Sequence, residues 1–257
     1  MKVTLRCDPA LLDLLPPPLP SRQLLPEWLR TMAPRRHSPL HGRDIRTVKQ
    51  CPPFVDAMAH GFMLLLPCDL RVEQGRFSWD WPLPPLTVDH HPRSPLSFHV
   101  AAQLQGLPGH DGSAAAIKFN SFWTIETEPG WALFAMHPAN RDDLPFRTLS
   151  GLVDTDRFHD TGINFPALWC DPGFDGVLPR GTPVAQCLLV QRTPLELVVQ
   201  AMDAGQAQRY AALVGEVLQQ PGVYRRRFRA RPQAVAPAPP ASTTSDAPAA
   251  RPAPNAD

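Results

Sequence analysis

Apolar and polar residues alternate in short runs along most of the chain, a pattern typical of strands. Beyond residue 116, Pro, Gly or Asp bounds each run, and these residues favour turns. The runs are IKFNSFWTIET, WALFAMH, RTLSGLVDTD, INFPALW and TPVAQCLLVQ. Before them, Phe62–Val72 and FSWDW flank the turn EQGR. Short strands separated by frequent turns predict a mainly β sandwich or barrel.

Two segments depart from this alternation and predict helices at the periphery of the β core. Pro52 and Pro53 favour the first turn of a helix, where a missing N–H costs little, and Gly61 favours its end. Phe54 and Met58 lie on one face of that helix. The second and clearer helix is GQAQRYAALVGEVLQQPG. Its apolar stripe consists of Tyr210, Leu213, Val214, Val217 and Leu218.

Composition divides the chain into four parts. Residues 1–50 mix prolines with a short amphipathic piece, and we expect an N-terminal arm lying against the body. Residues 51–200 carry the strand pattern of a β-rich core domain, and 201–222 contain the C-terminal helix. Residues 223–257 are first basic and then rich in Pro and Ala, which predicts a disordered tail because such a composition buries too little apolar surface.

Charge and composition favour a cytoplasmic protein. The net charge of +1 creates no overall field that would attract nucleic acid or a membrane. MKVTLRCDPALLDLLPPPLP lacks an apolar stretch of signal-peptide length, and the run Phe62–Pro67 is far shorter than the roughly 20 residues that span a bilayer. The arginines of YRRRFRAR adjoin the predicted tail, where charge is usually solvated. We therefore expect neither a membrane nor nucleic acid as a partner.

Three reactive side chains lie close together in CPPFVDAMAHGFMLLLPCD: Cys51, His60 and Cys68. Structural zinc sites commonly contain ligand pairs separated by two to four residues, whereas nine and eight positions separate these three. We therefore expect buried packing residues rather than a metal site. The chain has five cysteines, an odd number without close pairing, which predicts reduced thiols.

DHHPRSPLSFHVAAQ is a second candidate metal-binding segment. Asp89, His90, His91 and His99 offer the imidazole and carboxylate ligands that suit open catalytic iron or zinc sites. The segment lacks the close His-x-Asp or His-x-Glu pair usual for a two-histidine-one-carboxylate oxygenase. A metal-dependent oxygenase or hydrolase that uses His90, His91 or His99 stays open as an alternative function.

Two motifs near the end of the predicted core carry acids and an amide. GLVDTDRF occupies 151–158, and GTPVAQ occupies 181–186. An ordinary tight turn, whose aspartates bond their own backbone, explains the first motif without any function. In the functional interpretation, the bend at Asp154 and the strand at Gln186 come together in the β core and form one concave, polar surface.

Together these motifs resemble the third and fourth motifs of deoxyuridine triphosphatases. TEPGWALFAMHPANR lies where that family carries a proline-glycine turn and a phosphate-binding loop, and DPGFDG resembles a turn of the related deoxycytidine triphosphate deaminases. The resemblance covers about residues 117–191. It implies a β-clip-like core that assembles as a homotrimer.

The resemblance also implies roles for individual residues. Asp154 would be the catalytic carboxylate that orients or deprotonates a water, with magnesium neutralising phosphate charge. Phe158 would replace the aromatic residue under the sugar. The other ligand-binding residues would be Asn140, Arg141, Asp156, Asn164 and Gln186. Where the family has an Arg-Ser-Gly loop, this chain has acids at 142 and 143 that repel phosphate, so we expect binding ahead of hydrolysis.

A wider resemblance extends over about residues 20–195. The segments PEWLR, TVKQCPPFVDAMAHGF, KFNSFWTIETEPG, NRDDLPF, LSGLVDTD, INFPALW and GTPVAQ, in this order, are similar to a family of bacterial and phage proteins that has no assigned activity. This resemblance implies a shared fold and leaves the function open.

Three classes of function remain, and with them the question of whether the protein is an enzyme. The first is a binder of a small polar or phosphorylated, nucleotide-like ligand on the β-clip-like core. The second is the metal-dependent enzyme with histidine ligands. The third is a non-catalytic assembly protein that forms homo-oligomers and recruits partners through its tail.

Overall fold

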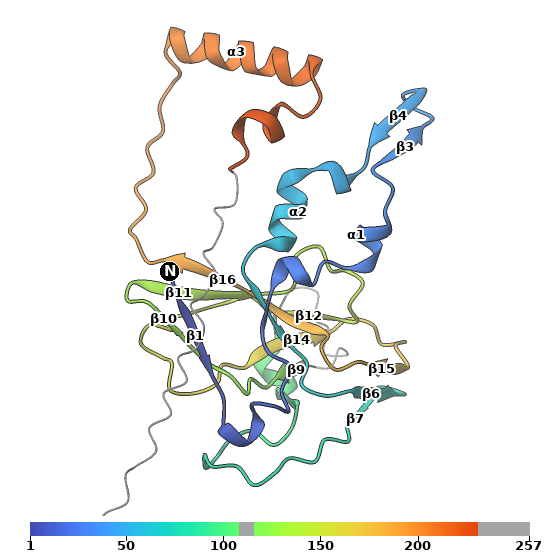
Figure 1. Ribbon diagram of the computed structural model, residues 1–257, viewed down its shortest axis with the longest axis vertical. Helices are drawn as coiled ribbons and strands as arrows, with labels where there is room; N and C mark the ends of the chain where they lie inside the picture. The colour runs from blue at the N-terminus through green and yellow to red at the C-terminus, as the bar shows by residue number, and fades with distance from the viewer. Residues whose placement is uncertain (108–115, 231–257) are drawn as a thin grey trace, which may run out of the picture. The chain divides into compact units, whose positions relative to one another are not determined.

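The computed structural model describes residues 1–107 and 116–230, and it is mainly β. The predicted β core with peripheral helices is confirmed (Figure 1). The strands are β1 Val3–Arg6, β2 Leu19–Pro20, β3 Arg35–Ser38, β4 Arg43–Arg46, β5 Phe62–Leu65, β6 Leu70–Glu73, β7 Arg76–Ser78, β8 Leu96–Phe98, β9 Ala116–Phe119, β10 Thr124–Thr127, β11 Trp131–Met136, β12 Phe146–Thr148, β13 Gly151–Val153, β14 Phe165–Trp169, β15 Gly176–Leu178 and β16 Pro183–Gln191. The α-helices are α1 Glu27–Thr31, α2 Pro52–Ala59 and α3 Ala204–Gln219. Short 3-10 helices are Pro9–Leu11, Ser21–Gln23, Val48–Gln50 and Ala101–Leu104.

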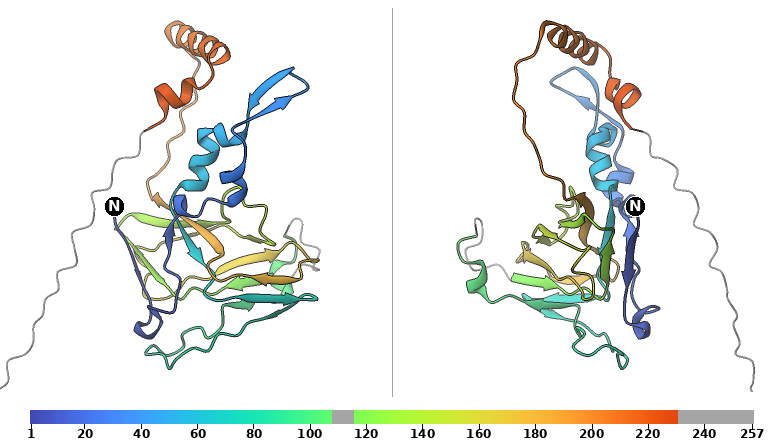
Figure 2. Two further views of the ribbon diagram at one scale, coloured as in Figure 1. Left: turned by 45° about the vertical axis from the view of Figure 1, so that its right-hand side comes forward. Right: turned by 90° about the vertical axis from the view of Figure 1, so that its left-hand side faces the viewer.

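Two antiparallel sheets form the centre of the unit Met1–Gln200. One has the strand order β13-β11-β16-β5-β2 and the other β12-β14-β9-β8. Their apolar side chains share one core, in which Leu133 and Cys187 from the first sheet join Ile117, Phe119 and Phe146 from the second. Figure 2 shows the strands of this unit from two further sides. Among the described residues the ladders form separate sheets rather than a closed barrel, so the fold is a sandwich.

Strand β16 organises the first sheet. It pairs with β11 from Gln186 to Gln191 and with β5 from Pro183 to Cys187, which places it between two neighbours. Its first five residues, PVAQC, are all buried, as the near-continuous apolar run predicts for a strand covered on both faces. Gln186 is the polar exception in that run.

The predicted helix at 54 is α2, and the glycine that ends it has a second role. Pro52 occupies the first turn of α2, and Gly61 has a φ of +71°, which favours glycine. A Cβ atom on Gly61 would lie 2.1 Å from the Cys187 carbonyl oxygen of β16. The glycine therefore lets the chain pass against the backbone of the central strand before it enters β5.

The segment 117–127, predicted as one strand, is two strands because the chain changes sheets within it. Asn120 leaves the ladder: its side-chain amide donates to the Ser94 carbonyl oxygen at 2.9 Å, and its side-chain oxygen accepts from Ser97 Oγ at 2.9 Å. Strand β10 then pairs with β1, near the start of the chain. Phe62–Val72 is likewise split, into β5 and β6.

The segment predicted as an N-terminal arm contributes strands to the sheets. Strand β1 pairs with β10, and β2 pairs with β5. The remaining strands of this segment, β3 and β4, pair only with each other. Residues 1–50 therefore combine two integrated strands with one separate hairpin.

The predicted second helix is α3, in a separate unit that begins at Ala201. Its N-cap is Asp203, whose side chain accepts from the Gln206 backbone N–H at 2.7 Å in a capping box. Every residue of the predicted apolar stripe is exposed in the described part of the chain.

The segment predicted as a disordered tail is described only in its first part. Tyr224–Phe228 form a π-helical turn, and residues 231–257 lie outside the described residues.

The five cysteines are free thiols, and the predicted burial of the Cys51 cluster holds only in part. Cys68 is buried, and burial raises the pKa of its thiol to about 11. Cys51 and His60, the residues that cap the two ends of α2, are exposed, so the prediction that they are packing residues is wrong.

His137 gives the fold a dependence on pH. Its Nδ1 accepts from the Thr148 backbone N–H at 3.2 Å, so its Nε2 donates to the Arg141 carbonyl oxygen at 3.1 Å, and this arrangement needs a neutral ring. Burial lowers the pKa of His137 below its ordinary value. Since the unfolded chain then binds the proton more readily, stability is present above about pH 6.5 and falls as the pH decreases toward the lowered folded-state pKa.

We expect His137→Gln to flatten this dependence. Urea unfolding at pH 7.5 and pH 5.5 should show a larger loss of stability on acidification in the parent protein than in the variant. His37→Gln, which changes an exposed histidine, is the matched control and should keep the parental pH dependence. Equal pH dependence in the parent and His137→Gln would contradict the assignment.

Candidate ligand-binding cavity

The acidic bend after β13 meets the end of β16 through Arg192. Arg192 Nη1 lies 2.9 Å from Asp154 Oδ1, and its Nη2 pairs with Asp156 Oδ2. The same Asp156 oxygen accepts from the Gly130 backbone N–H at 2.9 Å. The side chain of Asp156 is only 6% exposed, whereas that of Asp154 is 52% exposed. The bend is thus held by charge and hydrogen bonds at the β11–β16 end of the sheet.

Gln186 lies at the opposite end of this part of β16 and is fully buried. Its Nε2 donates to the carbonyl oxygens of Ala57 at 2.8 Å and His60 at 2.7 Å, at the C-terminal end of α2. Its Oε1 accepts from the Ala139 backbone N–H at 2.8 Å. Both amide hydrogens are therefore used within the protein, and the predicted meeting of the bend with the strand occurs at Arg192 rather than here.

The other predicted site residues are distributed over separate places. Asn140, at φ +57°, and Arg141 lie in the loop after β11, where Arg141 Nε donates to Asp143 Oδ1 at 2.8 Å. Phe158 is exposed beside the bend. Asn164, just before β14, is the one predicted ligand-binding residue that lines the cavity described next.

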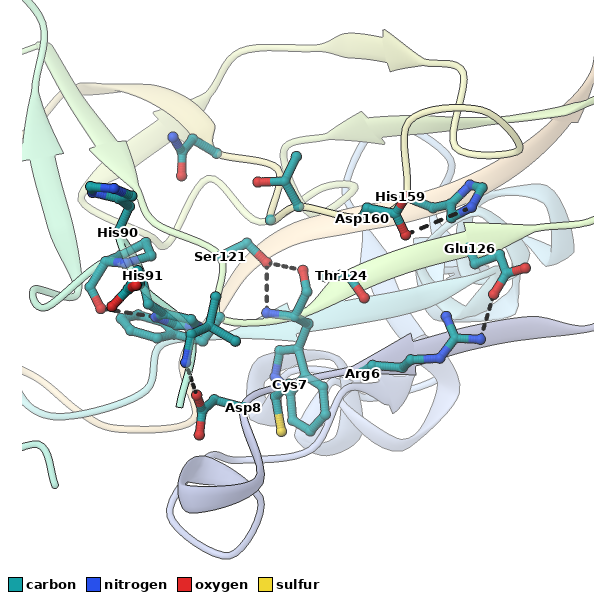
Figure 3. A pocket seen from close by; sticks show the side chains of 18 of the residues that line it. Arg6, Cys7, Asp8, His90, His91, Ser121, Thr124, Glu126, His159 and Asp160 are labelled. Carbon is teal, nitrogen blue, oxygen red and sulfur yellow. Dashed lines mark hydrogen bonds and ion pairs between the residues drawn. The ribbon is translucent and has the colours of Figure 1, made fainter. Parts of the chain in front are cut away.

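This cavity has a volume of about 820 Å³ and lies between the start of the chain and three later segments (Figure 3). It is partly open to solvent. Its lining residues are Arg6–Pro9, Val88–Pro92, Ser121–Thr124, Glu126, His159–Gly162 and Asn164. Volumes of about 300–1,000 Å³ are typical of small-molecule sites.

Two sets of contacts fix the walls of the cavity: the hydrogen bonds of Asp8 and the close approach of Gly162 to Ser121 and Thr124. Asp8, which is 3% exposed, accepts from Ala10 N–H through Oδ1 and from Thr87 and Val88 N–H through Oδ2, at 2.7 to 3.0 Å. Burial alone would raise the pKa of Asp8, but these hydrogen bonds lower it overall. Gly162 forms an isolated antiparallel β-bridge with Thr124. A Cβ atom on Gly162 would lie 2.6 Å from the Ser121 carbonyl oxygen, so only glycine fits there. These contacts fix the loop before β8 and the segment before β14 against the rest of the wall.

Aromatic rings close the inner wall. The Phe122 ring is buried, with the Trp81 ring edge-on at 4.8 Å and the His91 ring tilted at 5.2 Å between centroids. His91 Nδ1 lies 3.0 Å from the Pro92 carbonyl oxygen. The cavity thus combines an apolar wall with a polar rim.

The charges of the cavity are partly neutralised within the protein. Arg6 Nη2 donates to Glu126 Oε2 at 2.6 Å, and this hydrogen bond and charge lower the pKa of Glu126. Asp8 accepts from three backbone donors, which stabilise its charged form. Burial, and then the charge of Asp8, raise the pKa of Cys7, which disfavours a thiolate nucleophile.

Several polar groups of the rim have no partner within the described part of the chain. The Nδ1 atom of His159 is buried without a hydrogen bond, while its Nε2 lies 4.0 Å from Asp160 Oδ1 (Figure 3). Asp89 and Asn164 make no side-chain ion pair or hydrogen bond among the described residues. The side chains of Asp89 and Asn164 are therefore free to bind a ligand.

The histidines of the alternative metal hypothesis are divided. His90, at φ +59°, and His91 line the cavity, whereas His99 is bonded to Gln103, with Nδ1 3.1 Å from Oε1. No group of three His, Cys, Asp or Glu side chains in the described ranges has a geometry that would hold a metal ion.

No helix within those same ranges is long and apolar enough to cross a membrane.

Sequence reasoning missed most of this cavity. The motif GLVDTDRF predicted a site at the bend itself. The segment that lines the cavity here starts one residue after this motif, at His159. The adjacent pair His159-Asp160 was the available signal. The wall from Arg6 to Pro9 gave no signal, because only the pairing of β1 with β10 brings it there.

We expect Arg192→Met to reduce stability by about 2 kcal/mol, since it leaves the buried Asp156 carboxylate without its cation. Asp154→Asn should cost less than about 1 kcal/mol, because that partner is half exposed. Urea unfolding of both variants measures the difference. Equal losses would show that Asp156 does not depend on Arg192.

Comparison with known proteins yields only weak structural similarity. No protein-family model matches the sequence, and no curated protein matches it. Among solved structures, the chain is similar to the native dUTPase of EIAV, with a TM-score of 0.26 and 13% sequence identity. The similarity covers 34% of this chain and 68% of that chain.

Proposed function

We propose that the protein binds a small polar molecule, neutral or cationic, in the cavity between β1 and the segment that precedes β14. The observation that carries this proposal is the set of rim groups around a cavity of about 820 Å³ that lack a strong partner among the described residues: Asp89, Asn164, the buried Nδ1 of His159, and Asp160, whose one neighbouring cation is His159 at 4.0 Å. Such a combination of apolar wall and few convergent polar groups is typical of ligand sites.

The charge of the cavity argues against a polyphosphate. Its one arginine, Arg6, is engaged by Glu126, and the two carboxylates without a strong cationic partner, Asp89 and Asp160, repel phosphate. The histidines add positive charge only when they are protonated. A ligand with amine, amide or hydroxyl groups matches these acceptors better than a nucleoside triphosphate does.

The roles implied by the resemblance remain predictions. Catalysis by Asp154 with magnesium requires a free carboxylate, and in this structure Asp154 pairs with Arg192. A phosphorylated ligand at Asn140 and Arg141 would bind in the loop after β11, outside the cavity. Homotrimer assembly likewise remains a prediction.

Thermal unfolding with a ligand panel tests the proposal, because a ligand that binds only the native state raises the apparent melting temperature. The panel pairs free nucleosides and polyamines with nucleoside triphosphates, each with and without magnesium. We expect stabilisation by members of the uncharged or cationic set, and its loss in Asn164→Ala and Asp160→Asn.

Asn140→Gly is the matched control, since it changes an asparagine outside the cavity at a backbone conformation that glycine tolerates. It should keep the ligand response. A response only to triphosphates that Asn140→Gly abolishes and Asn164→Ala retains would refute the cavity as the site and favour the loop after β11.

A further inference from the structure

The hairpin formed by β3 and β4 is a strongly basic projection of the first unit. In Figures 1 and 2 it extends beyond α1 and α2, away from the sheets of the same unit. Residues 22–49 contain seven Arg or Lys residues and two acids, a net charge of +5, whereas the whole chain has a net charge of +1. The positive charge is therefore concentrated in this segment, and acidic residues in the rest of the chain offset it in the total.

The strand register places cations on both faces of the hairpin. Arg35 lies opposite Arg46 on one face, next to His37 and Asp44. Because neighbouring strand positions point to opposite faces, Arg36 and Arg43 belong to the other face. Each face of this two-stranded ribbon thus carries two arginines.

These arginines are not used to stabilise the fold. Arg35, Arg36, Arg43 and Arg46 are exposed, and none makes an ion pair or side-chain hydrogen bond with another residue of the described part. Like charges directly opposite each other destabilise a strand pair, as at Arg35 and Arg46. An anion lying against the hairpin would relieve this repulsion.

The root of the hairpin is fixed to the unit that carries it. Thr47 donates from its backbone N–H to the Pro34 carbonyl oxygen at 3.1 Å and from Oγ1 to the Ala33 carbonyl oxygen at 2.7 Å. Below this closure, the Trp28 ring of α1 contacts the Phe54 ring of α2 edge-on, with centroids 6.4 Å apart. At the tip, Leu40 is 90% exposed.

We propose that this hairpin binds duplex nucleic acid by entering a groove. A groove has a phosphate backbone on each side, so a ribbon inside it meets anions with both faces, which matches the two pairs of arginines. The major groove of B-form DNA, about 12 Å wide, admits a two-stranded β-ribbon. A flat acidic surface, such as a membrane or an acidic protein patch, would contact only one face.

Fluorescence anisotropy with a labelled 20-base-pair DNA duplex tests this proposal on the full chain. Replacing the four arginines with alanine should weaken binding at least about 10-fold at 100 mM salt. The slope of log Kobs against log salt should fall by about 0.9 for each phosphate that is no longer neutralised, and so by about 3.6 for four. The corresponding fourfold lysine variant keeps the charge and should retain most of the affinity.

The control removes four exposed arginines elsewhere in the first unit, Arg76, Arg93, Arg147 and Arg157. It has the same net charge as the alanine variant and should bind nearly as the parent does. Urea unfolding checks that all variants are folded. Equal losses in the alanine variant and the control would overturn the proposal, because binding would then follow net charge alone.

Two further outcomes would also overturn it. Loss of binding in Arg225→Ala/Arg226→Ala/Arg227→Ala, with no effect of the hairpin variant, would place the anion site in the second unit. Polyglutamate that competes as well as unlabelled duplex, with the same dependence on the hairpin arginines, would identify an acidic protein as the partner. Competition by duplex but not by polyglutamate at equal charge would support the groove.

Discussion

Gly61→Ala is expected to reduce the free energy of unfolding by about 3 to 4 kcal/mol. The residue has a φ of +71°, which costs an alanine roughly 1–2 kcal/mol. In addition, the new Cβ would lie 2.1 Å from the Cys187 carbonyl oxygen and 2.8 Å from Leu188 Cδ2. Neither the backbone of the central strand nor the chain that enters β5 can move without disturbing the ladder, so overpacking adds a further ~1–3 kcal/mol.

Gly75→Ala separates the two contributions. Gly75 has a nearly identical φ of +74°, but a Cβ on it meets no atom within 4 Å. This variant should therefore lose only the conformational part, about 1 kcal/mol. Urea unfolding of the two variants with a common slope gives the difference as the cost of the contact with β16. Equal losses would mean that the chain at Gly61 relaxes away from Cys187.

The central strands were predictable because each is marked by a run of apolar residues in its own sequence. TPVAQCLLVQ has a nearly continuous apolar run, as a strand between two neighbours needs, and it forms β16. Pro52 and Gly61 likewise marked the two ends of α2. In each case a few adjacent residues carried the whole signal.

Pairings between distant segments left no local signal. Arg6 opposes Thr124 across β1 and β10, although nothing near either residue indicates the other. The cavity depends on this pairing, because it brings the wall that begins at Arg6 to the segment after the bend. The candidate site was therefore predicted at the acidic motif itself, where local chemistry was visible, rather than beside it.

The basic hairpin was missed for a different reason. Strand prediction relies on an apolar face, and RRHS and RDIR have none, since both faces of β3 and β4 are largely polar and exposed. In addition, acidic residues elsewhere in the chain balance the positive charge of the hairpin, so the net charge of the whole chain is only +1. The local balance of acids and bases, taken over residues 22–49 alone, is the sequence signal that distinguishes this segment.

Gln186 explains why a polar residue occurs in the buried run of β16, and its replacement gives the second large effect. The last carbonyl groups of a helix have no partner within the helix. At the end of α2, Gln186 Nε2 supplies donors to the carbonyl oxygens of Ala57 and His60, and Oε1 accepts from Ala139 N–H. One side chain thus joins the helix, the central strand and the loop after β11.

Gln186→Met keeps the length of the side chain and removes all three hydrogen bonds. Each buried group left without a partner costs about 1–3 kcal/mol, so we expect a total loss of about 3 to 5 kcal/mol. Gln191→Met, at the exposed end of the same strand, makes the identical substitution and should change stability by less than about 0.5 kcal/mol. Urea unfolding measures both, and ligand response at the cavity should persist in whatever fraction of Gln186→Met is folded. Because the groups freed by the substitution belong to three elements, a loss as small as that of Gln191→Met would require water to enter the core and replace every bond.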